Sequence, residues 1–304
     1  MTTPTDDATA ALGVFYDQTY AGPGMKVEEV VKDGPLDKAG MNVKPGTIIE
    51  AIDGQVIAAS QDIAQFLNRK AGKPILLTVV DADTKKRDIV AKPITIAEEN
   101  RLLYARWVRR NQDEVDKLSN GQLGYVHIPG MNDGAYRTTF EEAMGKYATR
   151  KGLVVDTRFN GGGDLVADLD MFLTGKRFFE YTTDTRSAGF EPNFRWTKPS
   201  VSLANEANYS DGHCYAYMYK QLKIGPLLGM PVPGTCTFAG WEMLGDGLRW
   251  GVPGVGVKDS TTGKYLENLE TEPDIRLAND YSVVIKGTDQ QLEAAVAELS
   301  RLVK

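Results

Sequence analysis

The sequence has 304 residues, of which 42% are hydrophobic and 25% are charged, so it is long and apolar enough to bury a core without a metal or a disulfide. Its formal net charge of −6 argues against nucleic acid as a partner, because phosphate binding requires a basic surface. No apolar run of about 18 residues is present, so we expect no membrane span.

Residues 1–11 are polar and acidic and lack the basic and apolar regions of a signal peptide, which predicts a flexible leader. The compartment stays open between the cytoplasm and, if a targeting signal precedes this sequence, the periplasm.

Cysteine and histidine are too sparse for a zinc site. Cys214 and Cys236 form no CxxC pair, and His127 and His213 lie far apart in sequence. We therefore expect no metal and no cofactor. Both cysteines fit buried small side chains, and a bridge between them stays open.

Residues 12–96 combine short strand patterns, turn residues and a single helix. Ser60 is expected to cap a helix over 61–71, which Gly72 ends. Residues 97–120 contain no Gly or Pro and carry apolar residues near a helical period, which predicts a connecting helix.

From residue 121 onward the pattern is that of an α/β domain. Residues 152–156 are a continuous apolar strand of the buried kind, and three glycines, 161–163, follow it. A helix is expected over 165–174. Ser210 then stands directly before a helix expected over 212–222.

The glycine run and Ser210 together supply the two halves of an acyl-transfer site. Consecutive glycines let backbone N–H groups point into one space, where they hold an anion or a developing oxyanion, although a simple turn is the alternative. A serine between a strand and a helix exposes its hydroxyl at the positive end of the helix dipole. Taken alone, Ser210 is more simply explained as a helix N-cap.

Two groups of motifs carry a resemblance to known families. The run GPLDKAGMNVKPGTIIEAIDG, residues 34–54, resembles a PDZ domain. The order YVHIP, RFNGGG, NEANYSDG, YLEN and EPD, between residues 125 and 274, resembles the tricorn branch of the tail-specific serine peptidases. The resemblance implies an α/β protein with a small β-rich PDZ domain at 12–96 and a crotonase-like α/β peptidase core at 121–304.

The peptidase resemblance implies hydrolysis of peptide bonds in oligopeptides or unfolded proteins through an acyl-enzyme on Ser210. It implies an oxyanion hole made by the backbone N–H groups of Gly163, with Gly162, and Asp211. Glu267 matches the carboxylate that helps to orient the catalytic histidine through a second serine. The resemblance also implies a homo-oligomer in the full-length parent.

The general base of such a site is not found in this sequence. His127 matches a strand histidine with a structural role, and His213 follows Ser210 on a helix that carries its side chain away. The C-terminal processing relatives use a lysine where this chain has residues 235–240, which include no lysine. We therefore expect half a catalytic site, with the base supplied by another segment or another chain.

The resemblance also implies binding positions outside the acyl-transfer site. In the PDZ domain a backbone nest for a terminal carboxylate and two groove-facing side chains are expected, with plain core as the alternative: Leu12, Gly13, Val14, Phe15, Ile63 and Leu67. Glu180 and Asp184 are weak candidates for selecting basic substrate side chains, with solvated loop charges as the alternative.

Two other functions stay open. The same fold can serve as a catalytically inactive module that binds peptides or other ligands. Alternatively, the PDZ domain can serve as a scaffold. Labelling of Ser210 by a serine-reactive phosphonate separates the enzyme from the binding module, and a pull-down with peptides tests the scaffold.

Overall fold

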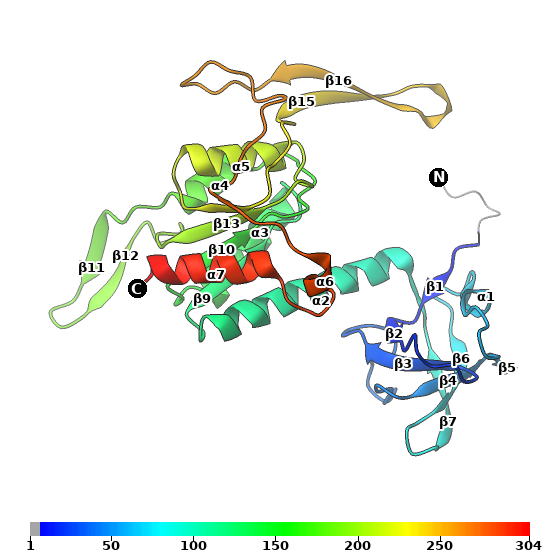
Figure 1. Ribbon diagram of the computed structural model, residues 1–304. Coiled ribbons are helices and arrows are strands. Elements are labelled where there is room, and N and C mark those ends of the chain that lie inside the picture. Colours follow the sequence, from blue (N-terminus) through cyan, green and yellow to red (C-terminus); the bar gives the residue numbers. More distant parts are fainter. Residues whose placement is uncertain (1–6) are drawn as a thin grey trace. The chain divides into compact units, whose positions relative to one another are not determined.

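The computed structural model describes residues 7–304 and comprises two compact units, Met1–Arg109 and Arg110–Lys304 (Figure 1). Each unit has a hydrophobic core of its own. The long helix α2 (Ile96–Leu118) contains the boundary between them, at the place where the sequence predicts a connecting helix.

The first unit is a six-stranded antiparallel sheet in the order β2-β3-β4-β6-β7, with β5 paired to β4. Apolar residues alternate along strands such as β6, so one face of the sheet packs onto the core. The strands are β2 (Val14–Tyr16), β3 (Met25–Val30), β4 (Ile48–Ile52), β5 (Gln55–Val56), β6 (Ile75–Val80) and β7 (Lys86–Ala91).

The leader expected over residues 1–11 overlaps the folded first unit at its end. Strand β1 (Ala10–Ala11) is buried and pairs with β8 (Ile94–Thr95), so the end of the expected leader belongs to the folded unit. The remainder of the leader includes residues 1–6, which lie outside the described residues.

The helix predicted over 61–71 is shorter in the structure. Helix α1 comprises only Ala64–Leu67, and Ser60 lies in a turn with a φ of 62° instead of capping it. The carboxylate of Asp62 accepts a hydrogen bond from the N–H of Ala64 at 2.9 Å, so the aspartate supplies the local side-chain contact that was expected from the serine.

The second unit is built on a parallel five-stranded sheet in the order β17-β14-β13-β10-β9. Every residue of the four longer strands is buried, as expected when helices cover both faces of a sheet. The strands are β9 (Leu123–His127), β10 (Gly152–Asp156), β13 (Ser200–Ala204), β14 (Leu227–Gly229) and β17 (Ile275–Arg276).

Helices lie on both faces of this sheet (Figure 1). Leu153 and Val155 of β10 join the core formed with α3, α4 and α5, whereas Gly152 faces α7, where a Cβ would lie 2.9 Å from Leu299 Cδ1. The helices are α3 (Asp133–Glu141), continued by a π-helical turn (Glu142–Lys146), α4 (Val166–Leu173), α5 (Asp211–Gln221), α6 (Tyr281–Val284) and α7 (Gln290–Leu302).

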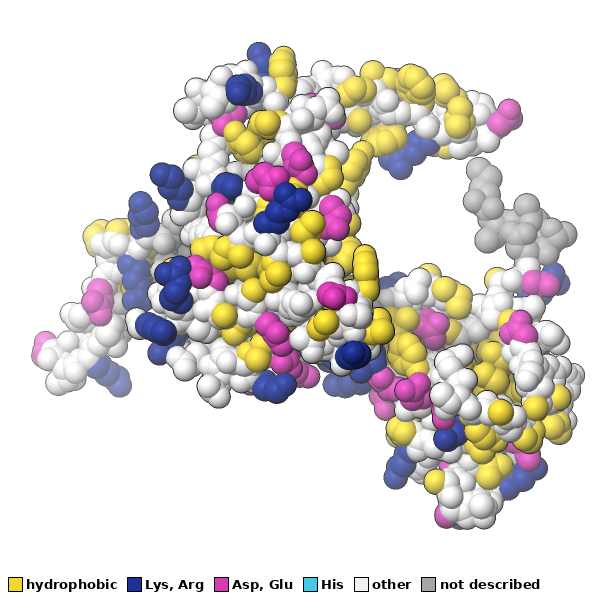
Figure 2. Space-filling view, viewed as in Figure 1, with side chains coloured by type: hydrophobic (Ala, Val, Ile, Leu, Met, Phe, Trp, Pro, Cys, Tyr) yellow, Lys and Arg dark blue, Asp and Glu magenta, His cyan; other side chains and the backbone are white. Residues whose placement is uncertain are grey.

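Two antiparallel hairpins extend from the second unit (Figure 1). One is formed by β11 (Phe179–Thr182) and β12 (Ser187–Glu191); the other is formed by β15 (Thr237–Met243) and β16 (Arg249–Gly256), with a 3₁₀ turn (Gly245–Gly247) near its tip. Apolar side chains are exposed along the β15–β16 hairpin, at the upper right of Figure 2.

None of the helices in the part of the chain that the structure describes is long and apolar enough to cross a membrane. Among residues 7–304 no three His, Cys, Asp or Glu side chains are grouped so that they could hold a metal ion.

Candidate active site

Ser210 forms the turn between β13 and α5 in an unusual backbone conformation, with φ 54° and ψ −122°. Its N–H donates to Thr235 Oγ1 at 2.9 Å, and its carbonyl accepts from the N–H of His213 at 2.9 Å. Ser210 precedes the helix, but its side chain makes no capping hydrogen bond. The N-cap explanation therefore does not account for this hydroxyl.

The glycine run meets the Ser210 turn directly. At Gly162, with a φ of 87°, a Cβ would lie 2.6 Å from the Cβ of Ser210 and 2.8 Å from the carbonyl oxygen of Tyr209. The N–H of Tyr209 also donates to the carbonyl of Asn160 at 2.9 Å. Only glycine permits this approach, so the two motifs, far apart in sequence, lie in van der Waals contact.

Two backbone amides beside this contact are unpaired. Among residues 7–304 the N–H groups of Gly163 and Asp211 donate to no protein acceptor. Gly162 differs from the expectation, because its N–H donates to Asn160 Oδ1 at 2.8 Å and is not available to an oxyanion. Gly162 thus provides the close approach, and the sequence interpretation of it as a donor is wrong.

Asn160 is a functional neighbour that the sequence reasoning did not single out. Its side chain is fully buried and donates to the carbonyl of Ile128 at 2.8 Å while accepting from Gly162. The asparagine therefore fixes the glycine run to the end of β9. Its position directly before the three glycines was the sequence feature that could have identified it.

The Asp211 side chain connects the helix after the glycine run to the helix after Ser210. The residue is 4% exposed, and its carboxylate accepts from the N–H of Leu165, at the start of α4, at 2.7 Å. Burial raises the pKa of Asp211, although hydrogen bonds from Leu165 and Val166 oppose the shift. This contact joins the first turn of α4 to the first turn of α5.

Neither histidine offers a free imidazole to Ser210. His213 is fully buried; its Nδ1 accepts from the N–H of Thr235 at 3.2 Å, which places the ring proton on Nε2, 2.9 Å from Thr271 Oγ1. His127 donates from Nε2 to the carbonyl of Arg158 at 3.0 Å. Burial lowers the pKa of both rings, as expected for neutral structural histidines.

Glu267 lies on an exposed loop near this cluster. The next residue, Asn268, donates its N–H to the carbonyl of Gly234 at 2.8 Å, so the Glu267 loop is fixed beside the segment that contacts Ser210. Within residues 7–304 the exposed Glu267 carboxylate has no hydrogen-bond partner. Its charge acts on the imidazole of His213 and favours the protonated ring.

Comparison with known proteins decides the family. Residues 122–277 match the model of peptidase family S41, and residues 17–95 match that of the tricorn protease PDZ domain. The chain belongs to peptidase family S41. We call residues 122–277 the S41 core.

The curated relatives are tricorn proteins. A tricorn protease homolog of Saccharolobus solfataricus is 28% identical over 304 residues, which cover 97% of this chain and 28% of the relative. The tricorn protease of Thermoplasma acidophilum is 28% identical over 84% of this chain and 24% of its own length. This chain therefore spans only about a fifth to a third of the length of the curated relatives it matches.

A solved structure shares the fold. The crystal structure of the tricorn protease superposes with a TM-score of 0.85 over 97% of this chain and 29% of that chain, at 23% sequence identity. At this identity the likeness establishes the fold. It is an S41 peptidase fold together with a PDZ domain, as the sequence motifs imply.

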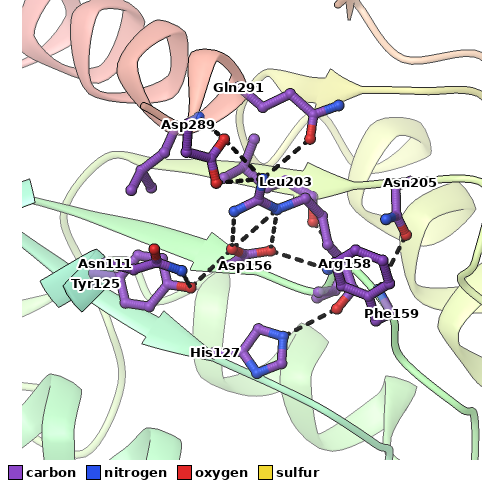
Figure 3. Close-up of polar contacts among 12 residues, drawn as sticks. Asn111, Tyr125, His127, Asp156, Arg158, Phe159, Leu203, Asn205, Asp289 and Gln291 are labelled. Carbon is purple, nitrogen blue, oxygen red and sulfur yellow. Dashed lines mark hydrogen bonds and ion pairs between the residues drawn. The ribbon is translucent and has the colours of Figure 1, made fainter. Parts of the chain in front are cut away.

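A buried charge network holds the strand that leads into the glycine run of the S41 core (Figure 3). Asp156 is fully buried at the end of β10 and pairs with Arg158 at 2.7 Å. Arg158, which is 2% exposed, also reaches Asp289 at 2.8 Å and Gln291 at 3.1 Å, both at the start of α7. Tyr125 donates to Asp156 at 2.8 Å.

The charges in this network stabilise one another. Burial opposes ionisation of Asp156, but the adjacent Arg158 guanidinium outweighs it, and the pKa of Asp156 stays below its ordinary value. Sequence reasoning missed the network, although two opposite charges at the end of an apolar strand were visible in VVDTR. The network connects α7 and β9 to the chain just before the glycines.

The cysteine question that the sequence left open has an answer in the structure. Cys214 and Cys236 form a disulfide, with their Cα atoms 5.2 Å apart. Cys236 is fully buried and Cys214 half-buried. The bridge joins Cys214, in the first turn of α5, to Cys236, which directly follows Thr235.

The expected PDZ groove residues are divided between core and surface. Leu12 and Leu67 are only 2% and 3% exposed and lie in the core of the first unit, so the interpretation of Leu67 as facing a peptide is wrong. Val14 and Ile63 pack at the margin of that core. Phe15 is 38% exposed, and a guanidinium, that of Arg106, lies 4.8 Å from its ring centroid.

The remaining nest residue, Gly13, has a φ of 66° and accepts at its carbonyl from the N–H of Val31 at 2.9 Å. Glu180 and Asp184 lie on the exposed β11–β12 hairpin, where Glu180 pairs in register with Phe190. Both residues are exposed, and within residues 7–304 neither carboxylate forms a hydrogen bond or an ion pair with the turn at Ser210, so their proposed role in substrate selection stays a prediction.

Proposed function

We propose that this chain supplies the nucleophile and the oxyanion hole of a serine peptidase. Ser210 Oγ attacks the carbonyl carbon of a peptide bond, and the oxygen that becomes negative is stabilised by the N–H groups of Gly163 and Asp211. The amine leaves with a proton, and water then hydrolyses the acyl-enzyme. The supporting observation is that the Ser210 hydroxyl makes no capping hydrogen bond, in a turn that packs against Gly162 and is flanked by two amides, those of Gly163 and Asp211, that are unpaired within residues 7–304.

The general base comes from outside the groups described above. Both nitrogens of His213 are engaged by Thr235 and Thr271, and His127 bonds to backbone. Glu267, exposed and unpaired within residues 7–304, is free to orient a histidine brought by another segment or chain. A relative in Sulfurisphaera tokodaii is described as the C-terminal subunit of a tricorn-like protease, which fits a site completed in a homo-oligomer or complex.

The substrates that we propose are oligopeptides or unfolded proteins. The S41 core and the tricorn-type PDZ domain occur together in the chain, and a PDZ domain binds an extended peptide at a sheet edge. Strand β2 is such an edge in the six-stranded sheet. In this proposal the PDZ domain captures chains that the Ser210 site cleaves.

A fluorophosphonate that reacts with activated serines tests the proposal. We expect mass spectrometry to find the adduct on Ser210, and Ser210→Ala to abolish it. The measurement is made on this chain and on a version with any upstream segment that the gene encodes. Labelling only with that segment would place the base there. Absence of labelling in both, together with intact peptide binding, would instead support a binding module without chemistry.

A further inference from the structure

The turn that carries Ser210 is held by a residue outside its own helix. The hydroxyl of Thr235 accepts from the Ser210 N–H at 2.9 Å and lies 3.4 Å from the carbonyl of Pro233, to which it donates. The N–H of Thr235 donates to His213 Nδ1 at 3.2 Å. Thr235 thus bonds both to Ser210, in the turn before α5, and to His213, in the first turn of α5.

The geometry at Ser210 depends on the two peptide planes that flank it. The bond to Thr235 fixes the plane that contains the Ser210 N–H. The Ser210 carbonyl, which accepts from the N–H groups of His213 and Cys214, lies in the same plane as the N–H of Asp211. Fixing both planes therefore fixes Ser210 and the direction of the Asp211 donor together.

Such fixing is required because the backbone of Ser210 is strained. Its φ of 54° lies in a region that is unfavourable for a non-glycine residue, and such a conformation persists only when the surroundings impose it. Within α5 only the carbonyl side of Ser210 is bonded, through His213 and Cys214. Thr235 supplies the bond on the amide side from a separate segment.

The Cys214–Cys236 disulfide fastens that segment to the helix. Cys236 follows Thr235, and Cys214 stands in the first turn of α5, so the bridge closes a small ring that includes the Ser210–Thr235 hydrogen bond. On one side the segment is anchored through Gly234, whose carbonyl accepts from Asn268. On the other side it continues into the exposed β15–β16 hairpin, which provides little buried contact.

We propose that Thr235 is a positioning residue for Ser210, and that the Cys214–Cys236 disulfide holds Thr235 in place, so that reduction of the disulfide slows acylation of Ser210. This inference rests on the proposed function. Reduction by a dithiol is balanced: the dithiol loses two electrons and two protons and forms its own disulfide, while the Cys214–Cys236 bond accepts them and becomes two thiols. Cys214 is half-buried and Cys236 is fully buried, so we expect the dithiol to attack at Cys214.

The hydroxyl is tested with a matched pair of variants. Thr235→Val keeps the shape and removes the acceptor, and we expect labelling of Ser210 by the fluorophosphonate to slow about fivefold, as for the loss of one hydrogen bond. Thr235→Ser keeps the acceptor and should label within about twofold of the wild-type rate. Backbone deuterium exchange of residues 205–215 should accelerate in Thr235→Val and stay unchanged in Thr235→Ser.

The disulfide is tested with dithiothreitol and with the double variant Cys214→Ser/Cys236→Ser. The chain contains no other cysteine, so a reductant has one target. We expect reduced wild type and the untreated double variant to show the same slower labelling and the same faster exchange over residues 205–215. Dithiothreitol should not change the double variant.

The two readouts separate this inference from the proposed function. If Ser210 is labelled neither in this chain nor in the version with the upstream segment, the proposed function fails, but deuterium exchange still decides whether Thr235 and the disulfide hold the turn. Unchanged exchange and labelling in Thr235→Val, or in reduced wild type, overturns the inference. Equal slowing by Thr235→Val and Thr235→Ser also overturns it, because the hydroxyl would then have no specific role.

Discussion

The Ser210 site and the PDZ groove differ in what their motifs determine. At Ser210 the expected chemistry is carried by backbone groups, and their directions follow from unusual backbone conformations that Gly162, Gly163 and Ser210 adopt. In the groove the expected contacts are side chains, and Leu67, expected to face a peptide, lies in the core. A motif that requires a particular backbone conformation thus predicts local geometry more reliably than one that requires a particular side-chain direction.

The largest effect that we predict concerns the network behind the glycine run. Arg158→Met should lower the free energy of unfolding by about 3–5 kcal/mol, because Asp156 is left buried without its partner. Denaturant titration measures the change. The control is Arg137→Met, which removes an ion pair with Asp133 whose side chains are 71% and 75% exposed, and should change stability by less than about 0.5 kcal/mol. A small effect of Arg158→Met would mean that the network does not hold the S41 core.

The next prediction tests the PDZ side of the comparison. Leu67→Ala should lower the free energy of unfolding by about 3 kcal/mol, because it leaves a cavity in the core of the first unit. Ile63→Ala, at the margin of the same core, should cost about 1 kcal/mol or less and is the variant that reports on peptide binding. Thermal unfolding and fluorescence titration with a peptide separate the two. Loss of binding in Leu67→Ala at full stability would restore the groove interpretation.

Substitutions at two neighbouring glycines test the geometry at Ser210, the other region of the comparison. Gly162→Ala places a Cβ 2.6 Å from the Cβ of Ser210, and the displacement should slow fluorophosphonate labelling of Ser210 about 100-fold, the typical cost of a misplacement near 1 Å. Gly161→Ala is the control, since a Cβ there meets nothing within 4 Å. Equal rates for the two variants would show that the close approach has no part in the reactivity of Ser210.

The sequence predicted features that depend on local backbone conformation but not contacts between distant segments. The glycine run, the serine turn and the buried strand before them are local patterns, and the structure has each of them close to its expected place. Contacts that depend on distant segments were out of reach, among them the Thr235 bond, the disulfide and the Asp289 contact of Arg158. These pairings are set by tertiary packing, which leaves no periodic signal in the sequence.

The smallest effect that we predict concerns Asp211. The pH dependence of stability reports on its carboxylate, which bonds to Leu165, and not on its N–H, which we propose as an oxyanion donor. Because burial raises its folded-state pKa above the unfolded value, the folded protein binds more protons between the two values, and the free energy of unfolding falls as pH rises through that window. Asp211→Asn keeps an acceptor for Leu165 and removes the titration, so it should lack this decline above about pH 4.

Asp280 provides the control of opposite sign, because hydrogen bonds from Ser282 lower its pKa. Its contribution is present above the unfolded pKa and is lost as pH falls, so Asp280→Asn should flatten a rise rather than a decline. Thermal unfolding from about pH 2 to 7 measures both slopes. If Asp211→Asn retains the wild-type decline, the link between the α4 and α5 first turns is not the titrating contact. If the decline disappears while labelling of Ser210 is unchanged, the Asp211 side chain serves stability, and its N–H alone serves the proposed oxyanion hole.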